Sequence, residues 1–208
     1  RHAAGEILAS ILSRYKIDGK SLIVIGIARG GVIVAAPIAK KLHSELDVIA
    51  PRKLRSPHNS EDAIGAIMHD GSLYLSIAAL ESEKDISSKY IDMEQLEQKR
   101  EACRRLCVYR PHLEEYVIKD RNVILVDDGI ATGATMIAAA RWIRNKEPER
   151  LIIAAPVAPK PVVERLKNEA DRIETIKNPS EFIVVEQFYE RFAPVSDDQI
   201  IEIVRRPP

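Results

Sequence analysis

One stretch, residues 123–136, constrains the fold of this chain more than any other, and it reads VILVDDGIATGATM. An apolar run, Val123–Val126, leads directly into Asp127 and Asp128, and small and hydroxyl residues follow before an alanine-rich segment. A short continuous apolar run with β-branched residues is typical of a buried strand in a parallel sheet. The pattern therefore predicts a buried strand, a tight loop at its carboxyl end and a helix that begins near Ala134.

The loop after this strand has the composition of an anion-binding site. Gly129 and Gly133 can adopt backbone angles that are closed to other residues, which allows an anion to approach the main chain. Free N–H groups at the start of the helix and the hydroxyls of Thr132 and Thr135 can then bind a phosphate. The two acids beside the loop offer acceptors for sugar hydroxyls or for a hydrated cation. A phosphate site next to a pair of carboxylates is what a sugar phosphate needs.

A second strand–loop–helix unit lies near the start of the chain. The apolar run 22–27 predicts a buried strand, and a helix is expected over residues 32–43. The loop between them, residues 28–31, reads Ala-Arg-Gly-Gly, so its backbone N–H groups can point into a cavity where Arg29 adds a positive charge. Two glycines before a helix are often only a turn, and this loop alone is weak evidence for a site.

Basic residues end a third expected strand, residues 47–54. Arg52 and Lys53 are either the solvated edge of a sheet or a clamp for an anion, and the presence of two glycine loops favours the clamp. A further strand, residues 151–157, ends in the turn 156–159. Because α/β proteins bind ligands at the carboxyl ends of parallel strands, these segments together predict one cleft.

The stretch 123–136 resembles the phosphoribosyl-diphosphate (PRPP) signature of the type I phosphoribosyltransferases, in which an apolar strand and two acids precede a loop of the form x-x-x-Thr-Gly-x-Thr. The wider order of residues 26–31 (GIARGG), 52–54 (RKL) and 187–190 (QFYE) is also similar to uncharacterised bacterial and archaeal members of that family. The resemblance implies a transferase that uses PRPP and Mg²⁺. In such an enzyme a nitrogen acceptor, for which a nucleobase is expected, displaces pyrophosphate from C1.

The resemblance also implies a role for each segment. The catalytic residues would be Asp127, Asp128, Arg52 and Lys53, with the two acids holding the ribose hydroxyls and meeting Mg²⁺ through those hydroxyls or through water. The 5-phosphate would be bound by Gly129, Ile130, Ala131, Thr132, Gly133, Ala134 and Thr135. The pyrophosphate would be bound by Ala28, Arg29, Gly30, Gly31, Arg52 and Lys53.

The acceptor is less constrained by the sequence. Hypoxanthine–guanine members of the family carry an aspartate immediately before the Thr-Gly pair, and Ala131 occupies that position here. Transfer to 6-oxopurines is therefore in doubt, and adenine-like, pyrimidine or unrelated acceptors remain open. Residues suggested for contact with the base are Val157, Ala158, Phe188 and Tyr189, of which the two aromatic residues suit a core equally well.

A polar segment, residues 56–62, corresponds to the movable loop that the family places over the reacting centre. Lids of this kind exclude water from a reactive intermediate. Glu61 and Asp62 are candidates for the carboxylate that accepts the proton of the incoming base, with Glu186 as the second choice.

These patterns predict an α/β fold with a mainly parallel sheet flanked by helices, in a single domain of residues 1–208. An insertion, at about residues 56–110, is expected to hold a β-hairpin and a long charged helix from about residue 85 to 109, and a small hood is expected from about residues 156–195 with the N-terminal segment. The stripe of the long helix that packs inward or against a partner subunit is expected to be Ala102, Cys103, Leu106 and Cys107. A homodimer is the expected assembly.

The net charge and the lengths of the apolar runs indicate which partners and which compartment to expect. Lys plus Arg equals Asp plus Glu at 31 each, so no net charge attracts nucleic acid or an anionic membrane, and neither is an expected partner. No apolar run is long enough to span a bilayer, and the two cysteines fit apolar packing in a reduced, cytoplasmic compartment. The alternative function is a PRPP-sensing regulator of the same fold, which is expected to have a basic face for RNA or DNA or an extra winged-helix domain. We expect an enzyme because 208 residues leave no room for such a domain.

Overall fold

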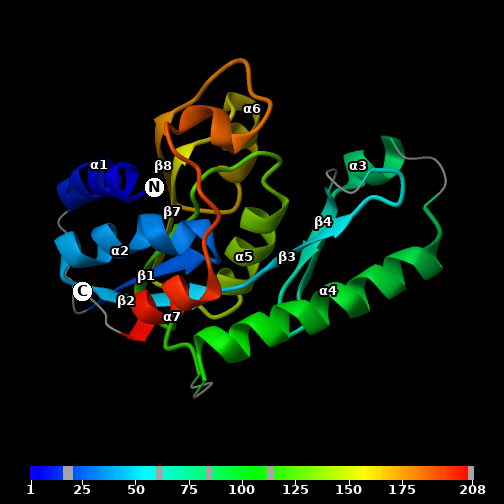
Figure 1. Cartoon of the computed structure of the whole chain (residues 1–208), viewed down its shortest axis with the longest axis horizontal. Coiled ribbons are helices and arrows are strands. Elements are labelled where there is room, and N and C mark those ends of the chain that lie inside the picture. Colours follow the sequence, from blue (N-terminus) through cyan, green and yellow to red (C-terminus); the bar gives the residue numbers. More distant parts are fainter. Residues whose placement is uncertain (16–20, 60–62, 83–85, 112–114, 206–208) are drawn as a thin grey trace.

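The computed structural model describes residues 1–15, 21–59, 63–82, 86–111 and 115–205 (Figure 1). Its centre is a parallel sheet of five strands in the order β2-β1-β6-β7-β8. The α/β class and the mainly parallel sheet predicted from the sequence are thus confirmed. The strands are β1 (Leu22–Ile27), β2 (Glu45–Ile49), β6 (Asn122–Val126), β7 (Arg150–Val157) and β8 (Arg172–Lys177).

Helices cover both faces of this sheet, because the side chains of each strand alternate between the faces. Ile124 and Val126 of β6 pack with helices α1 (His2–Leu12) and α2 (Gly30–Leu42). Val123 and Leu125 pack with α5 (Ala134–Arg144) and α6 (Lys160–Leu166) on the other face. All residues of β1 and β6 are buried, which explains why each strand reads as an unbroken apolar run.

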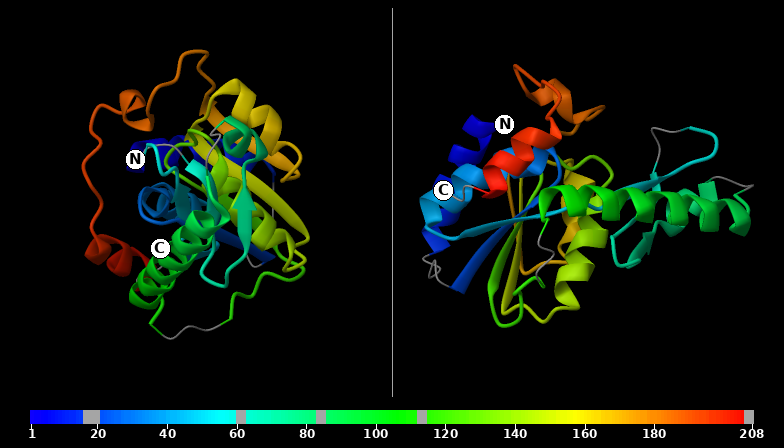
Figure 2. Two further views of the ribbon diagram at one scale, coloured as in Figure 1. Left: turned by 90° about the vertical axis from the view of Figure 1, so that its right-hand side faces the viewer. Right: turned by 60° about the horizontal axis from the view of Figure 1, so that its bottom comes forward.

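A second unit, which we call the arm, projects from one side of the sheet (Figures 1 and 2). It contains an antiparallel sheet in the order β3-β4-β5, followed by two helices. The predicted hairpin and long helix are both present in it. The elements of the arm are β3 (Arg52–Arg55), β4 (Ala63–Ile67), β5 (Leu73–Leu75), α3 (Ile77–Ser82) and α4 (Ser88–Tyr109).

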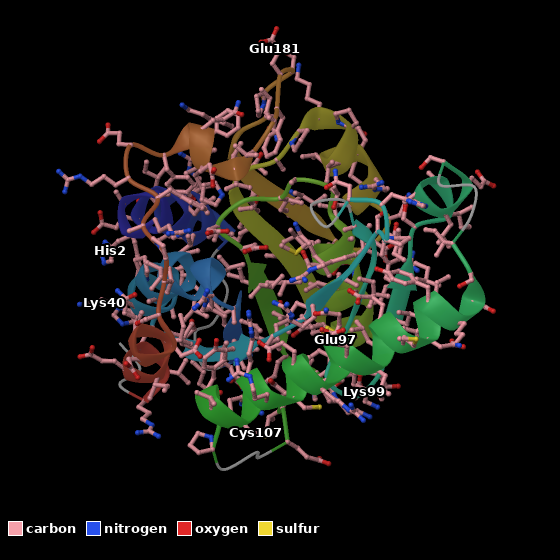
Figure 3. All side chains as sticks on the ribbon, turned by 45° about the vertical axis from the view of Figure 1, so that its right-hand side comes forward. His2, Lys40, Glu97, Lys99, Cys107 and Glu181 are labelled. Carbon is pink, nitrogen blue, oxygen red and sulfur yellow. The ribbon has the colours of Figure 1, made fainter. Side chains whose placement is uncertain are left out.

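One sequence prediction about this region was wrong. The strand predicted at residues 47–54 is two strands, since β2 belongs to the parallel sheet and β3 to the arm. Pro51 lies between them and has no N–H to continue a ladder of hydrogen bonds. Cys107, predicted to pack inward or against a partner subunit, is exposed in the single chain (Figure 3). The buried residues of α4 are Glu94, Gln98, Ala102, Leu106 and Tyr109.

After β8 the chain passes the start of α1, where Nη1 of Arg1 donates a hydrogen bond to the carbonyl oxygen of Ala193 at 2.7 Å, and its last described helix packs against α4. This segment contains a short 3-10 helix, η3 (Val185–Phe188), and the final helix α7 (Asp197–Arg205), and another 3-10 turn, η1 (Ser13–Tyr15), follows α1. A capping box opens α7, because the Gln199 side chain accepts a hydrogen bond from Ser196 N at 2.9 Å and the Ser196 hydroxyl accepts one from Gln199 N at 3.3 Å. Across the described parts of the chain, no helix has both the length and the apolar character needed to cross a membrane.

The order of the strands fixes where a ligand can bind. The chain leaves β1 toward β2 on one side, whereas β6 lies on the other side of β1 and leads on to β7 and β8. The loops after β1 and β6 therefore diverge at the point where the strand order reverses. In open α/β sheets, ligands bind in the crevice at this point.

Candidate active site

The two glycine loops meet at the reversal point so closely that side chains would not fit between them. A Cβ on Gly31 would lie 2.6 Å from the carbonyl oxygen of Val126 and 2.9 Å from the Cα of Asp127. A Cβ on Gly30 would overlap Oδ2 of Asp128. The loop after β1 therefore packs directly against the acid pair after β6, and its glycines are required by this contact.

The acid pair sits at the wall of a cavity with its oxygens partly engaged. Oδ1 of Asp127 accepts a hydrogen bond from the backbone N–H of Asp128 at 2.8 Å. Burial raises the pKa of Asp127 well above its ordinary value, and the neighbouring charge of Asp128 raises that pKa further. Oδ2 of Asp128 forms an ion pair with Nε of Arg1 at 2.6 Å. No sequence pattern pointed to Arg1, which reaches this place only because α1 packs beside α2.

The loop 129–135 has the geometry of a phosphate cradle. Gly133 is the N-cap residue of α5 and has a φ of 83°, a left-handed conformation that favours glycine. The backbone N–H groups of the first turn of α5 have no partner within the helix, and the helix dipole favours an anion there. Ile130 is buried, and its backbone N–H donates to the carbonyl of Val157 at 2.9 Å, which anchors the loop to the end of β7.

Two cavities flank this loop. Thr135 lines the cavity that also holds the acid pair, whereas Thr132 and Ala134 line a second cavity, of about 480 Å³, under the arm. Arg165 of α6 lines this second cavity too and donates a hydrogen bond to the carbonyl of Thr132. A phosphate over the loop would thus lie between the acid pair and the arm.

The cavity beside the acid pair has a volume of about 460 Å³ and is strongly cationic. It brings together most of the residues predicted for the acids and the pyrophosphate, which come from three separate parts of the chain. Two further basic residues, Arg55 of β3 and Arg105 of α4, line it as well and were not predicted as site residues. The predicted residues in its wall are Ala28, Arg29, Gly30, Arg52, Lys53, Asp127, Asp128 and Thr135.

A separate cavity of about 420 Å³ lies under the segment that contains η3, and we call it the hood cavity. Val157, Phe188 and Tyr189 line it, as suggested for base contact, whereas Ala158 is fully buried and does not belong to its wall. The Tyr189 hydroxyl donates a hydrogen bond to the carbonyl oxygen of Asp128 at 2.5 Å. Because Asp128 lines the cationic cavity and Tyr189 the hood cavity, this bond joins the walls of the two cavities.

Some predicted residues cannot be placed in the site. Glu61 and Asp62, the candidate lid acids, lie outside the described residues. Glu186 is exposed and does not line the cavities described above. Cys103 is partly buried, with its Sγ 3.2 Å from the carbonyl oxygen of His69, and takes no part in the site.

The carboxylates of Asp127 and Asp128 are also suitable ligands for a metal ion. Within the described ranges, three or more His, Cys, Asp or Glu side chains do not gather anywhere to hold a metal ion. Mg²⁺ keeps several waters and is usually bound through one or two carboxylates together with phosphate oxygens of a substrate. Two adjacent carboxylates at the wall of an anion-binding cavity fit that mode of binding.

Comparisons with known proteins agree with this architecture. Residues 2–191 match the family model described as the phosphoribosyl transferase domain. The chain is 34% identical over 206 residues to a protein from two strains of Mycobacterium tuberculosis that is provisionally named a phosphoribosyl transferase. That match covers 99% of this chain and 46% of the relative, so the chain spans about half the length of the protein it matches.

One solved structure is similar over almost the whole chain. The crystal structure of TT1426 from Thermus thermophilus has a TM-score of 0.78 and 36% sequence identity to this chain. The similarity covers 97% of this chain and 94% of that one, so both the sheet and the arm have counterparts there.

Proposed function

Since the chain belongs to the phosphoribosyl transferase domain family, we propose that it transfers the phosphoribosyl group of PRPP to a nitrogen acceptor and releases pyrophosphate, with Mg²⁺ as cofactor. We further propose that the acceptor is a nucleobase. One observation carries the proposal: a cationic cavity and a phosphate-type loop lie on the two sides of an acid pair at the strand-order reversal. PRPP has the matching order of groups, with pyrophosphate at one end of the ribose, hydroxyls in the middle and a 5-phosphate at the other end.

In this proposal each group of PRPP has its own segment of the chain. Loop 129–135 holds the 5-phosphate through backbone N–H groups and the two threonine hydroxyls. Asp127 and Asp128 accept hydrogen bonds from the ribose hydroxyls. The loop 28–31 and the basic pair after it, Arg52 and Lys53, hold the pyrophosphate.

The reaction needs little covalent help from the protein. The bond from C1 to the pyrophosphate oxygen breaks with its electron pair leaving on the pyrophosphate, and the lone pair of the acceptor nitrogen forms the new C1–N bond. Fixed positive charges of the cationic cavity stabilise the negative charge that develops on the leaving group. Mg²⁺, when bound, would neutralise part of the charge on the pyrophosphate. The proton of the acceptor passes to a base, for which we propose Glu61 or Asp62.

The hood cavity is our proposed place for the acceptor. It adjoins the acid pair through Asp128, and its wall includes the rings of Phe188 and Tyr189, on which a planar base can stack. Ala131 offers no carboxylate to meet N7 of a purine, and a hydrogen bond to a charged group contributes roughly 1.5–3 kcal/mol. We therefore propose that hypoxanthine and guanine are poor acceptors, by about one to two powers of ten.

Calorimetric titration of PRPP in the presence of Mg²⁺ tests the site. We expect the wild-type chain to bind PRPP, and we expect the double variant Asp127→Asn/Asp128→Asn to bind it at least tenfold more weakly, because hydrogen bonds from hydroxyls to charged acceptors contribute about 1.5–3 kcal/mol. The variant should also lose most of the dependence on Mg²⁺. Equal affinity of the two proteins would show that the acid pair does not hold the ribose.

A further inference from the structure

Arg105 contributes to the cationic cavity from an element that lies outside the two glycine loops. It is part of α4, the long helix of the arm, and it lines the same cavity as Arg29 and Arg52. Its side chain is only 19% exposed, whereas that of the preceding residue, Arg104, is 55% exposed and lines a different cavity, which Arg52 and Arg55 also line. Two adjacent arginines of one helix therefore have different surroundings.

Basic side chains outnumber acidic ones in the wall of this cavity, which has five basic residues and two acids, Asp127 and Asp128. Burial lowers the pKa of Arg52, and the nearby positive charge of Arg105 lowers that pKa further. The hydrogen bond from Nε of Arg52 goes to the neutral side chain of Gln98, at 3.1 Å. Glu101 and Glu94 offset part of this effect, and arginine carries its charge at all relevant pH values.

Glu101 is the acid that engages Arg105, and it is shared. Nε of Arg105 lies 2.7 Å from Oε1 of Glu101, and Nε of Arg104 lies 2.7 Å from Oε2 of the same carboxylate. One negative charge thus serves two guanidinium groups. A guanidinium has five N–H donors, so Arg105 retains donors that can meet a second acceptor in the cavity while Glu101 holds its Nε.

We propose that Arg105 is a binding residue for the pyrophosphate group of PRPP, and that Glu101 positions it. The inference rests on the proposed function and adds the arm helix α4 to the wall of the anion site. Pyrophosphate, with several negative charges and many acceptor oxygens, fits a cavity with five basic side chains from β3, α4 and the loop after β1: Arg29, Arg52, Lys53, Arg55 and Arg105. Loop 129–135 meets this cavity at Thr135, whereas Thr132 and Ala134 line the second cavity, to which Arg105 does not belong.

The chain offers a matched pair of variants for the test. Arg105→Gln removes the charge inside the cavity, and Arg104→Gln removes the same charge one residue earlier, from a side chain bound to the same carboxylate. Each variant is titrated calorimetrically with PRPP and Mg²⁺, with inorganic pyrophosphate and Mg²⁺, and with ribose 5-phosphate. We expect Arg105→Gln to weaken binding of PRPP and of pyrophosphate by about tenfold or more, as for a lost charge-assisted hydrogen bond, and to leave ribose 5-phosphate within about twofold. Arg104→Gln should bind all three like the wild type.

A third variant distinguishes the loss of hydrogen-bond donors from a general loss of folding. Arg105→Lys keeps the charge but loses the fork of donors, so its affinity for pyrophosphate should fall between those of the wild type and Arg105→Gln. Equal pyrophosphate affinity in Arg104→Gln and Arg105→Gln would overturn the inference, as would an equal loss for ribose 5-phosphate. If the wild-type chain does not bind PRPP at all, the proposed function fails, and that outcome is distinct from a failure of Arg105 alone.

Discussion

At the residue scale, Asp127 occupies a place that opposes folding. Its side chain is largely enclosed, and a second carboxyl follows it directly in the chain, so burial and the charge of Asp128 both raise its pKa. A raised pKa means that the folded chain holds this proton more tightly than the unfolded chain does. The free energy of unfolding therefore falls as the pH rises above the ordinary aspartate value. Such a cost is expected at a binding site, where a ligand removes it.

The variant Asp127→Asn should accordingly be more stable than the wild type at pH 7, by about 1 kcal/mol. Asparagine retains the oxygen that accepts from the N–H of Asp128 but carries no charge. The difference should shrink as the pH falls through the ordinary value of 3.8, because below that value the aspartate becomes protonated in both states. Urea denaturation at pH 7 and at pH 4 measures both effects. Asp92→Asn, on the exposed surface of α4, is the control and should change stability by less than about 0.5 kcal/mol. A destabilised Asp127→Asn at pH 7 would refute the electrostatic explanation.

At the scale of elements, α4 stabilises the arm through a narrow buried stripe. Ala102, Leu106 and Tyr109 face inward, and the Tyr109 hydroxyl donates to Oδ1 of Asp197 at 2.7 Å, which ties α4 to α7. Met93 and Leu96, in contrast, are 62% and 53% exposed. The helix therefore has one face that holds the fold together and one that does not.

This difference gives a direct test. Leu106→Ala should lower the free energy of unfolding by about 2–5 kcal/mol, because it leaves a cavity where a fully packed leucine was. Leu96→Ala on the exposed face should change it by less than about 0.5 kcal/mol. Chemical denaturation of the two variants and of the wild type measures these free energies of unfolding. Similar losses for Leu106→Ala and Leu96→Ala would mean that α4 packs by another face.

The sequence predicted the parallel strands well because they are buried on both sides and read as apolar runs. It failed where local signals conflict with the tertiary arrangement. Residues 47–54 read as one strand although Pro51 separates two sheets. Helix α3 was not predicted, since it is only six residues long and none of its residues is buried.

At the scale of the whole molecule, the site could be predicted only in part. Residues that follow strands were predicted to meet, and the acids, the basic pair and the loop after β1 do line one cavity. No sequence pattern assigns Arg1 or Arg105 to the site. For Arg105 the reason is that a charge on a long helix usually belongs to a solvated face. The positions of both residues depend on how the arm and α1 pack against the sheet. The predicted family is confirmed by the domain match, whereas the homodimer, the lid acids and the base contacts stay predictions.

The central claim is that this arrangement catalyses transfer from PRPP to a nucleobase, and one measurement tests it most directly. Pyrophosphate release is followed with PRPP, Mg²⁺ and, in turn, adenine, uracil, orotate, hypoxanthine and guanine under one set of conditions, for the wild type and for Asp127→Asn/Asp128→Asn. We expect at least one base other than hypoxanthine or guanine to give release that depends on that base and that the double variant has lost. Efficient turnover of hypoxanthine or guanine would contradict the interpretation of Ala131. Binding of PRPP without release for every base would contradict the enzyme itself and favour a PRPP sensor.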